Sequence, residues 1–207
     1  MDRLVDYEGV FRDSIGRKAG VAIIWRRGLR VKHISSSAHH VDVEVKGLFS
    51  ENVWRLTGFY GWAERDEKEL SWKLLKDIKP LSTLPWMVIG DFNQILFETE
   101  KREAYVPRAQ REMDDFREAI DYCGLMDIGY TRDAFTWWNK KSEPLAIFER
   151  LDRGCASLEW MDLFLSLTLK HLGWERSDHV PLKLSRDSRQ RRPRKKNVQI
   201  RGYVDQL

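Results

Sequence analysis

The chain has 207 residues and a formal net charge of +4, from 36 lysines and arginines against 32 aspartates and glutamates. Hydrophobic residues make up 42% and aromatic residues 12%, which excludes wholesale disorder and fits one globular domain with a sizeable core. The longest apolar runs, residues 20–25 and 86–90, are far shorter than a membrane span, and no signal-type segment opens the chain. Two cysteines are too few for a disulfide framework or a four-ligand zinc site, so we expect a reducing compartment.

The positive charge is concentrated at the C-terminal end. Residues 186–207 hold eight basic and two acidic residues, a net charge of +6, so residues 1–185 carry −2. Such a segment is typical of a solvated, flexible tail, and its basic residues could also bind nucleic acid. The candidate nucleic-acid-binding residues there are Arg191, Arg192, Arg194, Lys195 and Lys196. We therefore divide the chain into a folded domain, residues 1–185, and a basic linker or tail, residues 186–207.

Strand signals come first along the chain. Residues 20–25 form a short apolar run typical of a strand buried on both faces. Residues 41–46 alternate valines with Asp42, Glu44 and Lys46, which predicts a strand with one exposed face. Residues 54–60 and 85–91 predict two further strands.

Helix signals alternate with these strands. Residues 66–79 place Leu70, Leu74 and Ile78 on one helical face and stop at a proline. Residues 107–123 predict a second amphipathic helix that ends at Gly124. Its apolar face consists of Met113, Phe116, Ile120 and Cys123.

The last third of the domain gives shorter signals. Residues 131–139 indicate a turn and an aromatic strand, residues 157–164 a short helix, and residues 167–184 a loop flanked by strands. Because strands and helices are interspersed along one chain, the expected class is α/β or α+β, with sheet and helix layers in one domain.

The sharpest polar motif interrupts the strand at 85–91. There Gly90 and Asp91 end an apolar run, and Asn93 follows two positions later. If the strand continued, the two polar side chains would share a face and could hold a metal-bound phosphate and its attacking water. The alternative is an ordinary turn, since glycine, aspartate and asparagine all favour turns. On this motif alone, the turn is the better interpretation.

Two further polar groups come later in the chain. Ser177, Asp178 and His179 lie at a loop-to-strand junction, where an aspartate and a histidine would suit a metal ligand beside a phosphate contact, although a lone loop histidine is usually just solvated. Asp152 lies between Arg150 and Arg153, a pattern that by itself indicates a surface ion-pair cluster.

Together, the three groups resemble the endonuclease/exonuclease/phosphatase superfamily. The order Gly-Asp-x-Asn, Arg-Leu-Asp-Arg and Ser-Asp-His carries the likeness, which extends over residues 4–184. The sequence is most similar to the endonuclease domain of LINE-type (non-LTR) retrotransposons, particularly plant ones. The segments that carry this closer likeness are 58–62, 84–93, 100–102, 116–119, 135–137 and 149–153.

The resemblance implies an α/β (α+β) fold, a four-layer-type β-sandwich flanked by helices, and an Mg²⁺-dependent phosphodiesterase, with Mn²⁺ as the alternative ion. Asp91 would be the base or the positioner for the attacking water, and Asn93 would orient that water and bind the phosphate. His179 would hydrogen-bond a phosphate oxygen, supported by Asp152, and Asp178 would be a metal ligand.

Two aromatic residues also match family positions. Tyr60 matches the active-site tyrosine, a phosphate contact, and its alternative is a core or rim aromatic. Trp137 falls in a mainly structural family motif, and although this tryptophan could stack on a nucleotide, core packing is the better interpretation.

The sequence also departs from the family pattern. Family members open with a strand that carries an Asn, followed by a segment with the Glu that is the principal metal ligand, and this chain matches the family only after those parts. The resemblance thus implies a domain with its first strand and its metal-binding Glu missing, and a weakened metal site. Glu8 is the nearest acidic residue, but it aligns after the ligand position.

Two main hypotheses follow. The first is a metal-dependent endonuclease that hydrolyses DNA phosphodiester bonds, and the second is a catalytically inactive remnant with at most weak nucleic-acid binding. A third, a phosphatase acting on a small molecule, fits the retroelement-like helices less well. We expect DNA as the partner of an active enzyme, no membrane, no small-molecule cofactor, and residence in the nucleus or otherwise the cytoplasm, without secretion.

Overall fold

A computed structural model describes residues 6–12, 20–47, 51–102 and 108–186. The basic residues expected to contact nucleic acid, from Arg191 to Lys196, lie outside these ranges. The boundary that we placed after residue 185 therefore stays a prediction.

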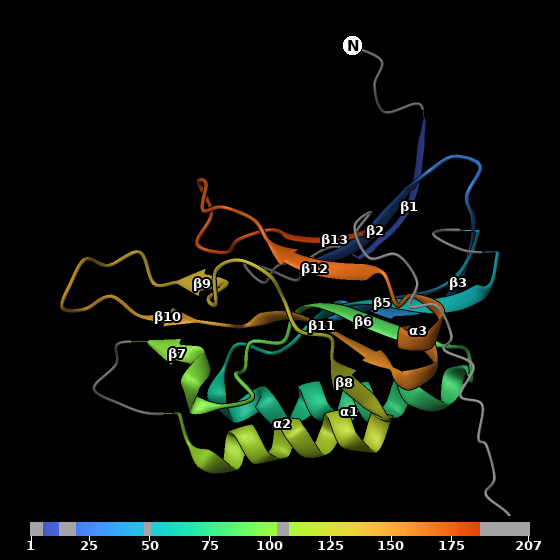
Figure 1. Ribbon diagram of the computed structural model, residues 1–207. Helices are drawn as coiled ribbons and strands as arrows, with labels where there is room; N and C mark the ends of the chain where they lie inside the picture. Colours follow the sequence, from blue (N-terminus) through green and yellow to red (C-terminus); the bar gives the residue numbers. More distant parts are fainter. Residues whose placement is uncertain (1–5, 13–19, 48–50, 103–107, 187–207) are drawn as a thin grey trace, which may run out of the picture.

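The centre of the molecule is a six-stranded mixed sheet (Figure 1). The order across it is β3-β4-β5-β6-β11-β8, in which β5 and β6 are parallel and all other neighbours are antiparallel. A parallel pair needs a crossover connection, and the segment between β5 and β6 supplies it as a helix. The strands are β3 (Arg30–Ser37), β4 (His40–Lys46), β5 (Val53–Tyr60), β6 (Trp86–Asp91), β8 (Leu125–Asp127) and β11 (Asp152–Ser157).

Two helices cover one face of this sheet, α1 (Lys68–Ile78) and α2 (Gln110–Cys123) (Figure 1). All four predicted apolar positions of α2 are buried, and the helix ends at a left-handed Gly124 with φ 67°, as predicted. Short 3₁₀ turns flank α1 and the next connection: η1 (Arg65–Glu67), η2 (Lys79–Leu81) and η3 (Glu98–Glu100).

The buried face of α1 is rotated from the predicted one. Trp72, Leu75 and Ile78 are buried, whereas Leu70 is 44% exposed. The prediction was wrong for Leu70 because the Trp72 ring stacks on Phe116 of α2, at 4.3 Å between centroids, and so sets which side of α1 faces the core.

The opposite face of the sheet carries two hairpins and a short helix (Figure 1). The hairpins are β1 (Tyr7–Arg12) with β2 (Val21–Arg26) and β12 (Leu167–His171) with β13 (Leu182–Arg186), and the helix is α3 (Leu158–Leu163), capped by the Ser157 hydroxyl. Their apolar side chains pack with β4 and β5 around Trp54 and Trp160. The mixed α/β sandwich with flanking helices is thus confirmed.

Two strands differ from their predicted burial. Strand β2 is exposed on its outer face, with Ile24 66% exposed, because in the described ranges it pairs only with β1 and packs inward with one face. Strand β4 is buried on both faces, with Asp42 fully buried, because α1 covers the face that we expected to be in water.

A small three-stranded sheet extends from one end of the molecule. It consists of β7 (Lys101–Arg102), β10 (Phe148–Glu149) and β9 (Trp137–Trp138), paired in that order. Among the residues that the structure describes, no helix is long and apolar enough to cross a membrane.

Candidate active site

Strand register places three predicted site residues side by side. Tyr60 of β5 lies opposite Asp91 of β6, and Asp91 lies opposite Asp152 of β11. All three stand at the same end of three adjacent strands, so sheet pairing alone brings two carboxylates and a phenol together.

Two glycines allow the backbone to approach closely at this end. A Cβ on Gly90 would lie 2.0 Å from the Phe59 carbonyl oxygen, and the φ of this residue is 150°. A Cβ on Gly61 would lie 2.5 Å from the Phe92 carbonyl oxygen. These contacts require glycine at both positions, and they fix Asp91 against the end of β5.

The strand β6 ends at Asp91, and Asn93 lies in a turn with φ 54°. Side chains two positions apart share a face only within a strand, and Asn93 is no longer in a strand, so our prediction that Asp91 and Asn93 share a strand face does not hold. Instead, its backbone N–H donates to Asp91 Oδ1 at 2.7 Å, and its side-chain Nδ2 donates to the Gly61 carbonyl at 2.8 Å. The asparagine is therefore held beside Asp91 by a turn.

His179 reaches the carboxylates from the loop before β13. Its backbone forms a bridge with Trp137, and the next residue, Val180, donates to the Thr136 carbonyl at 2.9 Å. The hydroxyl of Thr136, fully buried, accepts hydrogen bonds from the backbone N–H groups of Leu151 and Asp152. Thr136 thus connects the histidine segment to β11.

The side chains of Asp91, Asp152 and His179 form one compact group. His179 Nδ1 is 2.8 Å from Asp152 Oδ2, and His179 Nε2 is 4.0 Å from Asp91 Oδ2. One ligand atom from each residue lies within 4.8 Å of the others, a spacing at which they could hold a metal ion. Carboxylate oxygens suit Mg²⁺ and Mn²⁺, so the donor set fits the predicted ion.

The pKa values of Asp91 and His179 are shifted by burial and by the neighbouring charges of the group. Burial raises the pKa of Asp91 to about 6, and the charge of Asp152 adds to the rise, against the lowering influence of His179, the Asn93 amide and Lys68. Burial alone would lower the pKa of His179, but the hydrogen bond to Asp152 and the charges of Asp152 and Asp91 raise it above the usual value. Two carboxylates that repel each other at close range favour a bound cation.

Replacing Asp91 by asparagine is expected to stabilise the fold at neutral pH. The folded pKa of about 6 exceeds the ordinary 3.8, so the free energy of unfolding is highest below pH 4 and falls as the pH rises toward 6. At pH 8 Asp91→Asn should raise the free energy of unfolding by about 2 kcal/mol, and at pH 4 it should change little. Urea denaturation at both pH values, with a chelator present, measures this.

The exposed Asp77→Asn variant is the matched control and should be neutral at both pH values. If Asp91→Asn destabilised the protein at pH 8, the buried carboxylate would be a stabilising group, and its raised pKa would be wrong.

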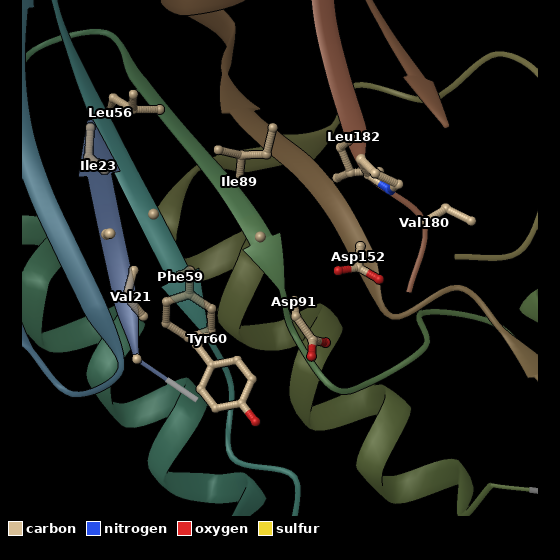
Figure 2. Close-up of a pocket in the computed structure, with 15 residues that line it drawn as sticks. Val21, Ile23, Leu56, Phe59, Tyr60, Ile89, Asp91, Asp152, Val180 and Leu182 are labelled. Carbon is tan, nitrogen blue, oxygen red and sulfur yellow. The ribbon is translucent and has the colours of Figure 1, made fainter. Parts of the chain in front are cut away.

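A cavity of about 440 Å³ opens beside this group (Figure 2). Figure 2 shows Asp91, Asp152 and Tyr60 at one end of it, while apolar side chains such as Ile23 and Ile89 line the remainder. The apolar lining explains why burial dominates the Asp91 pKa. The cavity lies between β2 and the start of β13, which belong to separate sheets. The missing first strand that the resemblance implies stays a prediction.

Other predicted site residues lie apart from this group. Asp178 is 3.6 Å from Lys140 Nζ, its side chain is 46% exposed, and it is not among the three residues that could share a metal. Trp137 packs against the buried cluster of Ile95, Met113 and Leu151, as expected for a core residue. Glu8 contacts Trp25 and Arg27 on the β1–β2 hairpin, away from the carboxylates.

Sequence reasoning missed Lys68, whose ammonium lies behind the Asp91–Asn93 turn. Its side chain is buried, and Nζ donates to the Asn93 carbonyl. The signal was present in the sequence: Lys68 falls on the same helical face as Trp72, Leu75 and Ile78, where a lysine is unusual.

Comparison with solved structures establishes the fold. The endonuclease domain of TRAS1, a telomere-specific non-LTR retrotransposon, is similar with a TM-score of 0.68 and 14% identity, over 89% of this chain and 82% of that chain. The 3′ phosphatase NExo from Neisseria, solved with a product DNA hairpin, is similar with a TM-score of 0.63 and 18% identity, over 88% and 80%.

An endonuclease/exonuclease/phosphatase family protein from Leptotrichia buccalis has a TM-score of 0.57 and 16% identity, over 88% of this chain and 72% of that chain. No family model matches the sequence, and no curated protein matches it. The chain therefore has the endonuclease/exonuclease/phosphatase fold, as the sequence motifs predicted.

Proposed function

We propose that this chain is a retroelement-derived endonuclease domain that hydrolyses DNA phosphodiester bonds with a divalent metal ion. The observation that carries the proposal is the group of Asp91, Asp152 and His179 at the ends of adjacent elements. A base, a charged hydrogen-bond donor and a carboxylate that orients the donor are the parts that in-line attack by water on a phosphodiester needs.

Asp91 accepts the proton of the attacking water in this proposal. With a pKa of about 6 before the ion binds, the Asp91 carboxylate is ionised at pH 7 and can accept this proton. Asn93, whose backbone N–H holds Asp91 Oδ1, orients the water and the phosphate.

His179 donates a hydrogen bond from Nε2 to a phosphate oxygen. Its other nitrogen, Nδ1, is 2.8 Å from Asp152 Oδ2, which fixes the tautomer and favours the imidazolium. The 4.0 Å between Nε2 and Asp91 Oδ2 is too long for a direct hydrogen bond and leaves Nε2 for the substrate. Tyr60, opposite Asp91 across the strand pair, lies where a phenol could contact the same phosphate.

When bound, a metal ion such as Mg²⁺ or Mn²⁺ polarises the phosphate and neutralises charge on the leaving oxygen. Asp91 and Asp152 would hold it by one oxygen each, with the second Asp91 oxygen left to accept the proton, and substrate phosphate and water would complete its coordination. Asp178, exposed and paired with Lys140, would contribute only if it turned toward the carboxylates.

Two observations support DNA as the substrate. The similar structures include a retrotransposon endonuclease domain and a 3′ phosphatase bound to a DNA hairpin. An aromatic cluster of Trp138, Phe148 and Trp174 lies next to the His179 segment, with the Arg102 guanidinium 4.2 Å from the Phe148 ring centroid. Aromatic and cationic side chains side by side suit stacking and backbone contacts to nucleic acid.

The second candidate is the inactive remnant. One observation favours it: within residues 6–12, 20–47, 51–102 and 108–186, two carboxylates stand at the site, and Glu8 is held on another element. Two carboxylates, one of them engaged by His179, make a weak Mg²⁺ site.

Nicking of supercoiled plasmid by the full 207-residue chain tests the proposal. We expect slow, divalent-metal-dependent nicking that rises with millimolar Mg²⁺ or Mn²⁺ and disappears with excess chelator, because the two-carboxylate site binds the ion weakly. Agarose-gel conversion of supercoiled to open-circular plasmid measures it. Absence of nicking at every metal concentration would establish the remnant instead.

A further inference from the structure

Lys68, the first residue of α1, is a buried charge that the proposed reaction does not use. Its side chain is 4% exposed, on the helix face that packs against the sheet. Burial lowers its pKa to about 8, and Arg108 adds to the lowering, while Asp91, Glu112 and Glu149 oppose it. A lysine is rarely buried to this degree without a specific partner.

The partner is the backbone of the active-site turn. Lys68 Nζ donates a hydrogen bond to the carbonyl oxygen of Asn93. That carbonyl belongs to a residue in the left-handed region, at φ 54°, a conformation that costs free energy for any residue with a side chain.

Three contacts hold Asn93 in this conformation. Its N–H donates to Asp91 Oδ1, its Nδ2 donates to the Gly61 carbonyl, and its own carbonyl accepts from Lys68. The first two come from the sheet end itself. The third, like the first, is a charge-assisted hydrogen bond, and it is the one that comes from outside the turn.

The same helical turn also holds the neighbouring loop. Ser71, one turn after Lys68 and fully buried, accepts a hydrogen bond at 2.9 Å from the backbone N–H of Trp62. The Gly61 N–H in turn donates to the Asp91 carbonyl at 2.8 Å. The start of α1 therefore fixes both segments that carry Tyr60 and Asp91 to one rigid helix.

We propose that Lys68 is a positioning residue that fixes the Asn93 turn, and through it the amide that orients water and phosphate. The assignment of Asn93 to phosphate rests on the proposed function, whereas the effect of Lys68 on the turn does not. Lys68 reaches Asn93 through the backbone carbonyl, so it acts without touching the substrate.

Hydrogen exchange of single amides tests the positioning directly. In Lys68→Met, which keeps most of the unbranched side chain and removes the donor, the Asn93 amide should exchange about tenfold faster by NMR. Amides in the centre of the sheet, such as Arg55, should keep their protection. Lys73→Met, at a 70% exposed position on the same helix, is the matched control and should leave Asn93 unchanged.

Binding of inorganic phosphate, measured by calorimetry with Mg²⁺ present, gives the functional readout. We expect Lys68→Met to weaken it about fivefold or more, Lys68→Arg to recover part of the loss, and Lys73→Met to match the unaltered chain. If the chain nicks DNA, kcat should fall in Lys68→Met while KM for plasmid changes little, because Lys68 does not contact DNA.

The outcomes separate this inference from the proposed function. Unchanged exchange at Asn93 in Lys68→Met overturns the positioning role, and so does an equal rise of exchange across the whole sheet, which would make Lys68 a general stabiliser. A chain that neither nicks DNA nor binds phosphate, yet shows the local exchange effect, would refute the proposed function and leave the positioning role supported.

Discussion

Replacing His179 by alanine is expected to lower the rate of metal-dependent plasmid nicking by about 100-fold or more. The variant removes the imidazolium that Asp152 orients at 2.8 Å and whose pKa is raised by that contact and by Asp91. A charged donor that binds the phosphate more tightly in the transition state than in the ground state acts on kcat. Initial nicking rates over a range of plasmid concentrations measure the loss.

His33→Ala is the matched control, because His33 lies on β3 and its ring contacts Ser36 rather than the carboxylates. It should nick at the rate of the unaltered chain. Asp152→Asn tests the orienting contact separately and should lose activity with the fold intact, since an amide does not favour the imidazolium. A His179→Ala rate within threefold of the unaltered chain would remove the histidine from the mechanism.

The largest effect on stability is expected at Asp42, far from the candidate site. Asp42→Ala should lower the free energy of unfolding by about 3–5 kcal/mol, because it leaves the fully buried Arg55 guanidinium without its counterion. In the folded protein Arg55 donates to both Asp42 oxygens, at 2.9 and 2.7 Å, and Thr57 donates to the same carboxylate at 2.8 Å. For a domain of this size the melting temperature should fall by about 10 °C.

Thermal denaturation followed by circular dichroism checks this prediction, with Asp77→Ala as the control. Asp77 also pairs with a cation, Lys73, but its side chain is 57% exposed, so its loss should cost less than about 0.5 kcal/mol. Replacing Asp42 and Arg55 together by leucine and methionine should recover much of the loss, since it is the unpaired charge that is costly. A single Asp42→Ala variant as stable as the parent chain would show that water reaches Arg55.

Local sequence patterns correctly predicted the elements that pack against the rest of the protein through one face. The apolar spacing of α2 and its glycine stop were confirmed, and so were the strands β5 and β6 and the short helix α3. Where a second layer covers the other face of an element as well, the alternation of apolar and charged residues predicted its burial wrongly. Strand β4 alternates valine with charge, yet both faces are buried, because Arg55 and Thr57 of β5 donate hydrogen bonds to Asp42, and Arg55 in turn donates to the Ile78 carbonyl of α1.

The sequence by itself determined the motif order that led to the endonuclease/exonuclease/phosphatase fold, together with the strand end that carries Asp91. The resemblance also implied that Asp152 supports His179, and the structure places the two side chains 2.8 Å apart. The tertiary structure alone left Asp178 with Lys140 and buried Lys68 behind Asn93. The physical reason is that burial, pKa and pairing depend on groups brought in from other elements, and spacing along one strand or helix does not specify them.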